Sequence, residues 1–130
     1  MSSLRVGFLG PLGTFTHGAL MSQPDLADSS TVPFASIEDV LRAVAAGDVT
    51  CGVVPLENAI EGTVSATVDS LIFDHDVLIQ REIVIPISLS LLVTPGVQQA
   101  DITEVWSYPH ALAQCRTFLR SLGTLETRVA

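Results

Sequence analysis

An acid and an amide stand side by side where a predicted strand gives way to a loop. Residues 51–54 form a short apolar run that predicts a buried strand. Pro55 ends the run because proline has no amide hydrogen for a central ladder, and Glu57 and Asn58 follow at once. In open α/β sheets, ligands bind just beyond the carboxyl ends of the strands. We therefore predict that these two side chains line a binding site. The alternative is that they only cap and turn the chain.

A glycine-rich turn follows the first predicted strand, residues 4–9. Residues 10–13 are Gly-Pro-Leu-Gly, and a helix is predicted over residues 14–21 with Thr14 or Thr16 as its N-cap. Such a turn can bind an anion, because free amides and the helix dipole point toward whatever lies there. The glycine spacing does not match the dinucleotide-binding fingerprint. An ordinary tight strand–helix turn is the alternative interpretation.

Strands and helices alternate through the first half of the chain and would position both segments. Ser36 is a good N-cap with Asp39 three residues later, and Gly47 ends the helix that Ser36 begins. The alternation predicts an α/β fold with a mostly parallel sheet and right-handed crossovers. The predicted elements are strand 4–9, helix 14–21, edge strand 31–34, helix 37–46, strand 51–55 and helix 64–73, with a loop over residues 22–30.

The second half of the chain has a different pattern, with two successive apolar segments before the next helix. Pro86 interrupts the second of them, and Pro109 suits the first position of a helix. The predicted elements are strands 77–82 and 83–93, a turn at 94–96, strand 104–106, helix 111–121 and the start of a strand at 126–129.

Composition and charge exclude several classes of protein. The chain has 130 residues, enough for one domain, and a net charge of -8 with six Lys plus Arg, which argues against a nucleic-acid surface. No apolar run reaches the ~18 residues of a membrane span, and no secretory signal is visible. Cys51 and Cys115 lack metal-ligand spacing, so we expect buried thiols in a reducing cytoplasm and no metal.

Four segments, in this order along the chain, resemble the prephenate dehydratase family. Residues 10–16, GPLGTFT, are similar to the family's GPxGTFS, and residues 82–89, EIVIPISL, to its ExxxPIxHxL. Residues 54–64, VPLENAIEGTV, with TVD at 67–69, are similar to VPxENSxxGxVxxTLD. Residues 107–115, SYPHALAQC, are similar to SHPQALAQC. The four segments lie in register along nearly the whole chain.

The resemblance implies a fold and a reaction. Family members have two α/β lobes around a cleft, as in type-2 periplasmic binding proteins, so residues 1–77 would form the first lobe and residues 78–130 an incomplete second lobe. A Thr-Arg-Phe motif and a phenylalanine-binding ACT domain would follow beyond residue 130. The implied reaction converts prephenate to phenylpyruvate, water and carbon dioxide without a cofactor.

The resemblance also assigns roles to individual residues. Glu57 and Asn58 would be catalytic and line the cleft, with Asn58 the substrate ligand. Thr14, with the amides after Gly10, would hold a carboxylate, and Ser107 and Gln114 would contact substrate from the other lobe. Fixed donors of this kind suit a dianion that loses hydroxide and carbon dioxide. The alternatives are that Thr14 and Ser107 only cap helices and that Gln114 is a solvated helix residue.

The chain departs from the family pattern at several positions. Tyr108 and His110 replace the family's His and Gln, so no catalytic role is assigned to His110, and Thr16 and Ser88 stand where Ser and His are common. Residues 127–129, Thr-Arg-Val, come too early to be the Thr-Arg-Phe motif. We therefore expect residues 1–130 alone to be inactive. An incomplete lobe would expose apolar surface, so we also expect a homo-oligomer.

Two other functions remain open at this point. One is a non-catalytic module that binds small anions in a cleft like that of periplasmic binding proteins. The other is a nucleotide-binding α/β domain, which depends only on the glycines before Thr14. Binding of prephenate without turnover would favour the first, and stabilisation by a dinucleotide would favour the second.

Overall fold

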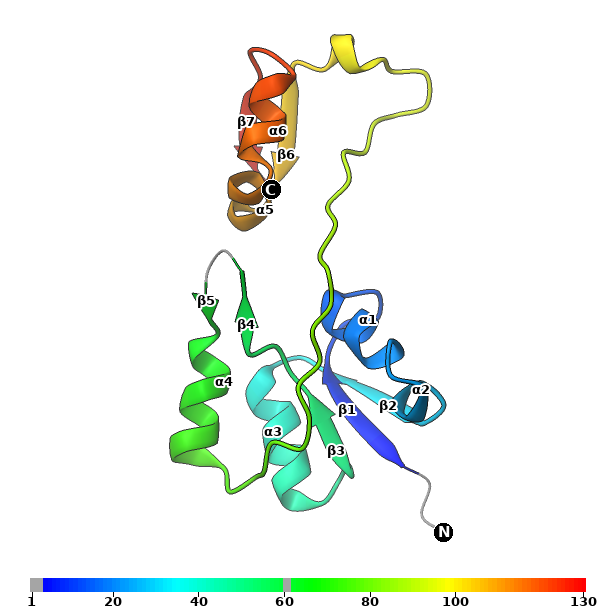
Figure 1. The fold of residues 1–130 in the computed structure, drawn as a ribbon, viewed down its shortest axis with the longest axis vertical. Helices are drawn as coiled ribbons and strands as arrows, with labels where there is room; N and C mark the ends of the chain where they lie inside the picture. The colour runs from blue at the N-terminus through cyan, green and yellow to red at the C-terminus, as the bar shows by residue number, and fades with distance from the viewer. Residues whose placement is uncertain (1–3, 60–61) are drawn as a thin grey trace. The chain divides into compact units, whose positions relative to one another are not determined.

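The computed structural model describes residues 4–59 and 62–130 and divides the chain into two compact units (Figure 1). The first unit is Met1–Pro86 and the second is Ile87–Ala130. Each unit contains parallel strands joined through helices. The predicted α/β class with mostly parallel strands is confirmed. The predicted lobe boundary after residue 77 stays a prediction.

The first unit is built on a three-stranded parallel sheet with strand order β2-β1-β3. The central strand β1 (Arg5–Leu9) pairs with β2 (Ser30–Phe34) on one side and with β3 (Cys51–Val53) on the other. The predicted edge strand is confirmed as β2, and an edge is where a sheet tolerates Pro33.

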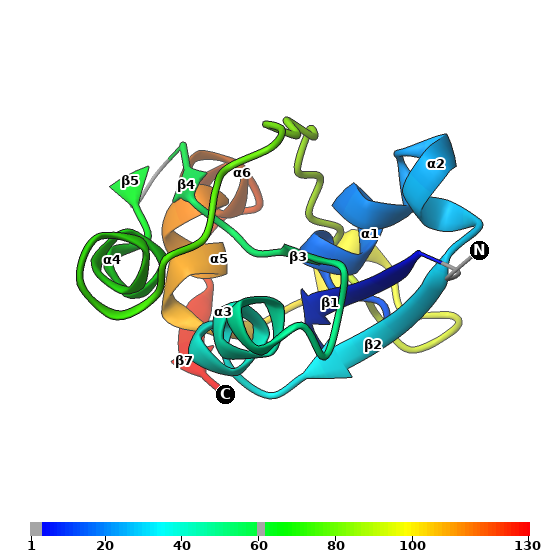
Figure 2. The ribbon, with the colours of Figure 1, turned by 90° about the horizontal axis from the view of Figure 1, so that it is seen from below.

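Helices cover both faces of this sheet. The connection from β1 to β2 carries α1 (Phe15–Met21) and α2 (Pro24–Ala27), and the connection from β2 to β3 carries α3 (Ile37–Ala46). The two connections run in opposite directions across the sheet, so right-handed crossovers place α1 and α3 on opposite faces, as Figure 2 shows. The loop predicted over residues 22–30 is wrong at α2, which begins with a proline at its first position.

The ends of α3 follow the predicted capping pattern. The Ser36 hydroxyl accepts a hydrogen bond from the amide of Asp39 at 3.1 Å. Gly47 ends the helix with a φ of +79°, a left-handed conformation that favours glycine. With these caps the helix has the bounds that were predicted, residues 37–46. The capping residues alone were enough to predict where it begins and ends.

The two faces of β1 contact different helices. Val6 and Phe8 are fully buried and form the core with Leu20 of α1 and Leu26 of α2. Gly7, between them, pairs in register with Gly52 of β3. A Cβ at Gly52 would lie 2.6 Å from Cγ1 of Val40 in α3. The absence of a side chain at Gly52 therefore lets α3 pack directly against β3.

Replacing Gly52 by alanine is expected to destabilise the first unit. The added methyl group cannot fit beside Val40, so α3 must move away from β3. Overpacking of this kind costs about 1–3 kcal/mol of unfolding free energy. Urea unfolding of the variant and the parent measures the difference. Gly18→Ala is the matched control, because a Cβ at Gly18 meets nothing within 4 Å, and an equal loss in both variants would contradict the packing argument.

After β3 the chain forms a small hairpin and a helix. Strands β4 (Glu57–Asn58) and β5 (Gly62–Thr63) are antiparallel, and α4 (Ser65–Asp69) continues into a π-helical turn, η1 (Ser70–Asp74). The predicted helix over residues 64–73 is confirmed. The predicted loop at Glu57 and Asn58 is wrong, because these residues pair with β5. Part of the segment predicted as loop or turn, residues 60–61, lies outside the described residues.

Residues 77–93, all of which the structure describes, form no strand. The two strands predicted there are wrong. Ile83 lies against the core of the first unit, and its backbone pairs with no strand among the described residues. Pro86 removes one amide donor from the segment.

Arg81 attaches this extended segment to α2. Its guanidinium donates to both carboxylate oxygens of Asp25, at 2.9 Å each, and to the side-chain oxygen of Gln23 at 3.1 Å. The Arg81 hydrogen bonds hold the pKa of Asp25 below its usual value. Both side chains are about half exposed (46% and 55%), so the pair contributes modestly to stability.

Asp25→Asn is expected to lower stability at neutral pH but not in acid. A carboxyl group whose folded pKa is depressed stabilises the fold above its unfolded pKa, near ~3.9. That contribution disappears as the pH falls through the folded pKa. Urea midpoints at pH ~7 and pH ~2.5 measure the change, with Asp28→Asn as control. A deficit of equal size at both pH values would contradict the proposed ion pair.

The second unit is a parallel two-stranded sheet with a helical crossover. Strand β6 (Glu104–Ser107) pairs with β7 (Glu126–Val129), and α5 (Pro109–Gln114) and α6 (Arg116–Ser121) lie between them in the chain. A turn at residues 94–97 and a 3-10 turn, η2 (Gln99–Asp101), precede β6. The predicted single helix over residues 111–121 breaks at Cys115, which has φ -92° and ψ 5°.

Candidate functional site

The carboxyl edge of the first sheet brings together the two segments predicted to carry chemistry. All three strands are parallel, so the turn after β1 and the hairpin after β3 leave the sheet at the same edge. Phe8 and Val53 are register partners near the ends of their strands. The connection after β1 leads to β2, and the hairpin follows β3. Ligands of open α/β sheets bind beyond the carboxyl ends of the strands.

The turn at residues 10–14 is fixed to the sheet by its glycines. The Gly10 amide donates to the carbonyl of Phe34 at 2.9 Å, and a Cβ at Gly10 would lie 2.9 Å from Cβ of Pro33. Gly13 has a φ of +84°, and its amide donates to Nδ1 of His17 at 3.1 Å. Glycine is needed at the first position for close approach and at the second for a left-handed backbone.

Thr14 is the N-cap of α1. Its hydroxyl accepts from the amide of His17 at 3.2 Å and donates to the carbonyl of Pro11 at 3.0 Å. A hydroxyl has one hydrogen to donate, so this donor is already used inside the turn. A direct contact between Thr14 and substrate stays a prediction, and it would require the Pro11 bond to break.

His17 is part of this turn, although the sequence analysis assigned it no role. Its ring stacks on Phe8, with centroids 5.1 Å apart and planes inclined by 23°. Since Nδ1 accepts the Gly13 amide, the neutral ring carries its hydrogen on Nε2. The stacking partner comes from the central strand, and no local spacing in the sequence could have indicated it.

Glu57 and Asn58 are exposed on β4, opposite Thr63 and Gly62 of β5. Two hydrogen bonds fix the base of this hairpin. The Val64 amide donates to the carbonyl of Leu56 at 2.8 Å, and the Thr67 hydroxyl donates to the carbonyl of Pro55 at 2.6 Å. The hairpin therefore presents the acid and the amide on a short ladder rather than on a free loop.

An open pocket of about 290 Å³ lies at the same carboxyl edge, between the ends of β1 and β2. The described residues that line it do not include Thr14 or Asn58. The pocket therefore lies beside the predicted site residues and is not formed by them. Its lining residues are Gly10, Pro11, Pro33, Phe34 and Ala35.

Ser107 and Gln114 lie in the second unit. Ser107 is the last residue of β6 and is half-buried, while Gln114 is the last residue of α5 and is exposed. The N-cap of α5 is Tyr108, so Ser107 is not the residue that begins this helix. Ser107 therefore precedes α5 and Gln114 ends it, and their contact with substrate stays a prediction.

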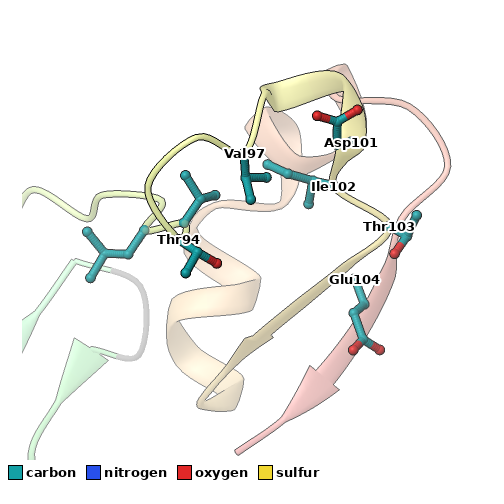
Figure 3. Close-up of a pocket in the computed structure, with 8 residues that line it drawn as sticks. Thr94, Val97, Asp101, Ile102, Thr103 and Glu104 are labelled. Atoms are coloured by element: carbon teal, nitrogen blue, oxygen red, sulfur yellow. The ribbon is translucent and has the colours of Figure 1, made fainter.

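A second open pocket, of about 380 Å³, lies within the second unit (Figure 3). Its lining combines apolar side chains such as Val97 and Ile102 with the carboxylates of Asp101 and Glu104. Asp101 accepts from the amide of Gln98 at 3.1 Å, and Glu104 pairs with Arg128 at 3.1 Å. Two carboxylates and no lining cation among the described residues make this pocket unsuited to a dianion.

Burial raises the pKa of the Cys51 thiol, and the charge of Arg81 opposes this rise only in part. Cys51 and Cys115 are both free. Among residues 4–59 and 62–130, no three His, Cys, Asp or Glu side chains gather as metal ligands. Within the same ranges no helix has the length and apolarity needed to span a bilayer.

The family model and the curated relatives carry the same family name. The prephenate dehydratase family model matches residues 6–129. The bifunctional chorismate mutase/prephenate dehydratase of Pseudomonas aeruginosa is 44% identical over 98% of this chain, and the prephenate dehydratase of Bacillus subtilis is 40% identical over 89%. The chain spans 34% and 41% of the lengths of these two relatives.

A solved structure is similar to the chain as well. The prephenate dehydratase of Arthrobacter aurescens, in complex with L-Phe, superposes with a TM-score of 0.84 and 37% sequence identity. The match covers 98% of this chain and 42% of that chain. This likeness agrees with the α/β architecture and the mostly parallel strands described above.

Proposed function

The chain belongs to the prephenate dehydratase family, and we propose that the full gene product converts prephenate to phenylpyruvate, water and carbon dioxide. The observation that carries this proposal is the family match over residues 6–129. It is supported by the position of the acid–amide hairpin, which leaves the sheet at the same edge as the glycine-rich turn.

The proposed reaction needs donors rather than a metal or a redox group. The ring carboxylate leaves as carbon dioxide, its bonding electrons enter the ring, and the ring hydroxyl departs with an added proton as water. In this proposal Asn58 donates a hydrogen bond to the substrate, and Glu57 lines the site. Backbone amides of the turn at residues 10–14 hold a carboxylate together with Thr14, whose hydroxyl would exchange its bond to Pro11 for one to the substrate. Ser107 and Gln114 add contacts from the second unit.

The test is turnover of prephenate by the purified full gene product. We expect phenylpyruvate to accumulate without an added cofactor and in the presence of a metal chelator. Binding of prephenate without turnover would instead support the alternative, a non-catalytic module for small anions. Loss of turnover in the chelator would contradict metal-independent catalysis.

Two further properties belong to the same proposal. We expect the gene product to be cytoplasmic, as a biosynthetic enzyme, and to form a homo-oligomer. Exposed apolar side chains such as Leu78 (80%) and Val84 (82%) support association. Sedimentation at micromolar concentration measures the mass, and a monomer would contradict this expectation.

A further inference from the structure

Thr67 carries a buried hydroxyl that does not bond to its own helix. Its side chain is 1% exposed, although it lies in the short helix α4. In helices, a threonine hydroxyl commonly donates to a carbonyl three or four residues earlier. The Thr67 hydroxyl instead donates to the carbonyl of Pro55, twelve residues earlier, at 2.6 Å. The bond therefore joins α4 to the segment between β3 and β4.

The acceptor of this bond lies where the chain turns from the sheet into the hairpin. Pro55 has no amide hydrogen, so its carbonyl is its only backbone hydrogen-bonding group. The ladder beyond it has two residue pairs, Glu57 with Thr63 and Asn58 with Gly62. An isolated two-stranded hairpin has only marginal stability in water. The hydrogen bonds at the base of this short hairpin therefore determine the direction in which it leaves the sheet.

We propose that Thr67 is a positioning residue that sets the direction of the β4–β5 hairpin, and with it the placement of Glu57 and Asn58. The expected effect of Thr67 on catalysis rests on the proposed function. Its expected effect on the hairpin rests only on the hydrogen bond to Pro55. Without the hydroxyl, the Pro55 carbonyl loses its partner at a partly buried site, beside the buried side chain at position 67. The base of the hairpin then shifts toward a new partner, and Asn58 moves with it.

The first experiment compares Thr67→Val with Thr67→Ser in the full gene product. Valine keeps the shape of threonine and removes the hydroxyl, and we expect kcat for prephenate to fall by roughly ten- to a hundredfold with a smaller change in KM. Serine keeps the hydroxyl and should restore most of the rate. A parental kcat in Thr67→Val, or an equal loss in both variants, would overturn the proposal.

Thr50→Val is the matched control. The Thr50 hydroxyl accepts from the amide of Arg5 at 3.2 Å, at the amino edge of the sheet, away from the hairpin. The control therefore removes a threonine–backbone bond in which the hydroxyl is the acceptor rather than the donor, and we expect its kcat to stay at the parental value. A fall in kcat equal to that of Thr67→Val would show a general loss of stability instead of mispositioning.

A second readout does not depend on activity. The Val64 amide, which donates to Leu56 at the base of the hairpin, should exchange its hydrogen faster in Thr67→Val than in the parent or in Thr50→Val. If the parent does not turn over prephenate, the proposed function fails, while this exchange rate still decides the role of Thr67. If Thr67→Val does not fold, Thr67→Ala and Thr67→Ser both lack the methyl group and differ only in the hydroxyl. Equal exchange in that pair would overturn the proposal.

Discussion

Asn58→Asp in the full gene product is expected to lower kcat/KM for prephenate by roughly a hundredfold or more. The two side chains have the same size, so the change removes a hydrogen-bond donor without opening a cavity. It also places a second carboxylate beside Glu57, where a dianion is proposed to bind. Loss of a donor and added repulsion act in the same direction. Steady-state kinetics with prephenate measures the effect.

The matched control for this change is Gln99→Glu. It makes the same amide-to-acid change on η2, an exposed turn of the second unit. We expect parental kinetics and parental thermal unfolding for the control. The Asn58 backbone pairs with Gly62 whichever side chain it carries. Kinetics of Asn58→Asp that match those of Gln99→Glu would remove Asn58 from the proposed site.

Phe8→Ala is expected to cost about 3–5 kcal/mol of unfolding free energy. Phe8 is fully buried on the central strand β1 and belongs to the core that it forms with Val6, Leu20 and Leu26. Removing the ring leaves a cavity between the central strand and α1, and its neighbours are held by separate elements. Urea unfolding measures the loss against the parent. A marginally stable domain would be largely unfolded by a change of this size.

Phe73→Ala is the control for the same chemical change on the surface. Phe73 is 77% exposed, so little apolar burial is lost with it. We expect its unfolding free energy to stay within about 0.5 kcal/mol of the parent. A loss in Phe8→Ala no greater than in Phe73→Ala would show that Phe8 does not anchor the core.

Capping and helix-ending residues predicted the helices α1 and α3 of the first unit well, because each of these helices carries such residues at its own ends. Thr14 and Ser36 cap their helices as expected, and Gly47 ends α3. The apolar strands before and after α3 alternate with these helices at the spacing of a parallel sheet. Prediction therefore succeeded where the information lay within a few residues of each element.

Long-range contacts decided the remaining features. The hairpin at Glu57 depends on Thr67, twelve residues from its acceptor, and His17 depends on a ring in β1. Residues 77–93 have an alternating apolar pattern but no ladder partner among the described residues. A strand requires that partner, and a pattern within one segment cannot supply it. The predicted roles of Thr14, Ser107 and Gln114 in binding substrate stay predictions.

The central position of β1 has a consequence for how the chain is made. Val6 pairs with Thr31 on one side and with Cys51 on the other, so β1, which precedes both partners in the chain, waits for them during synthesis. At ~5–20 residues per second, the wait for β3 lasts roughly two to ten seconds. During that interval Val6 and Phe8 are uncovered, and parallel pairing offers no local hairpin to protect them. We therefore expect the nascent chain to bind chaperones that hold apolar segments until translation has passed β3.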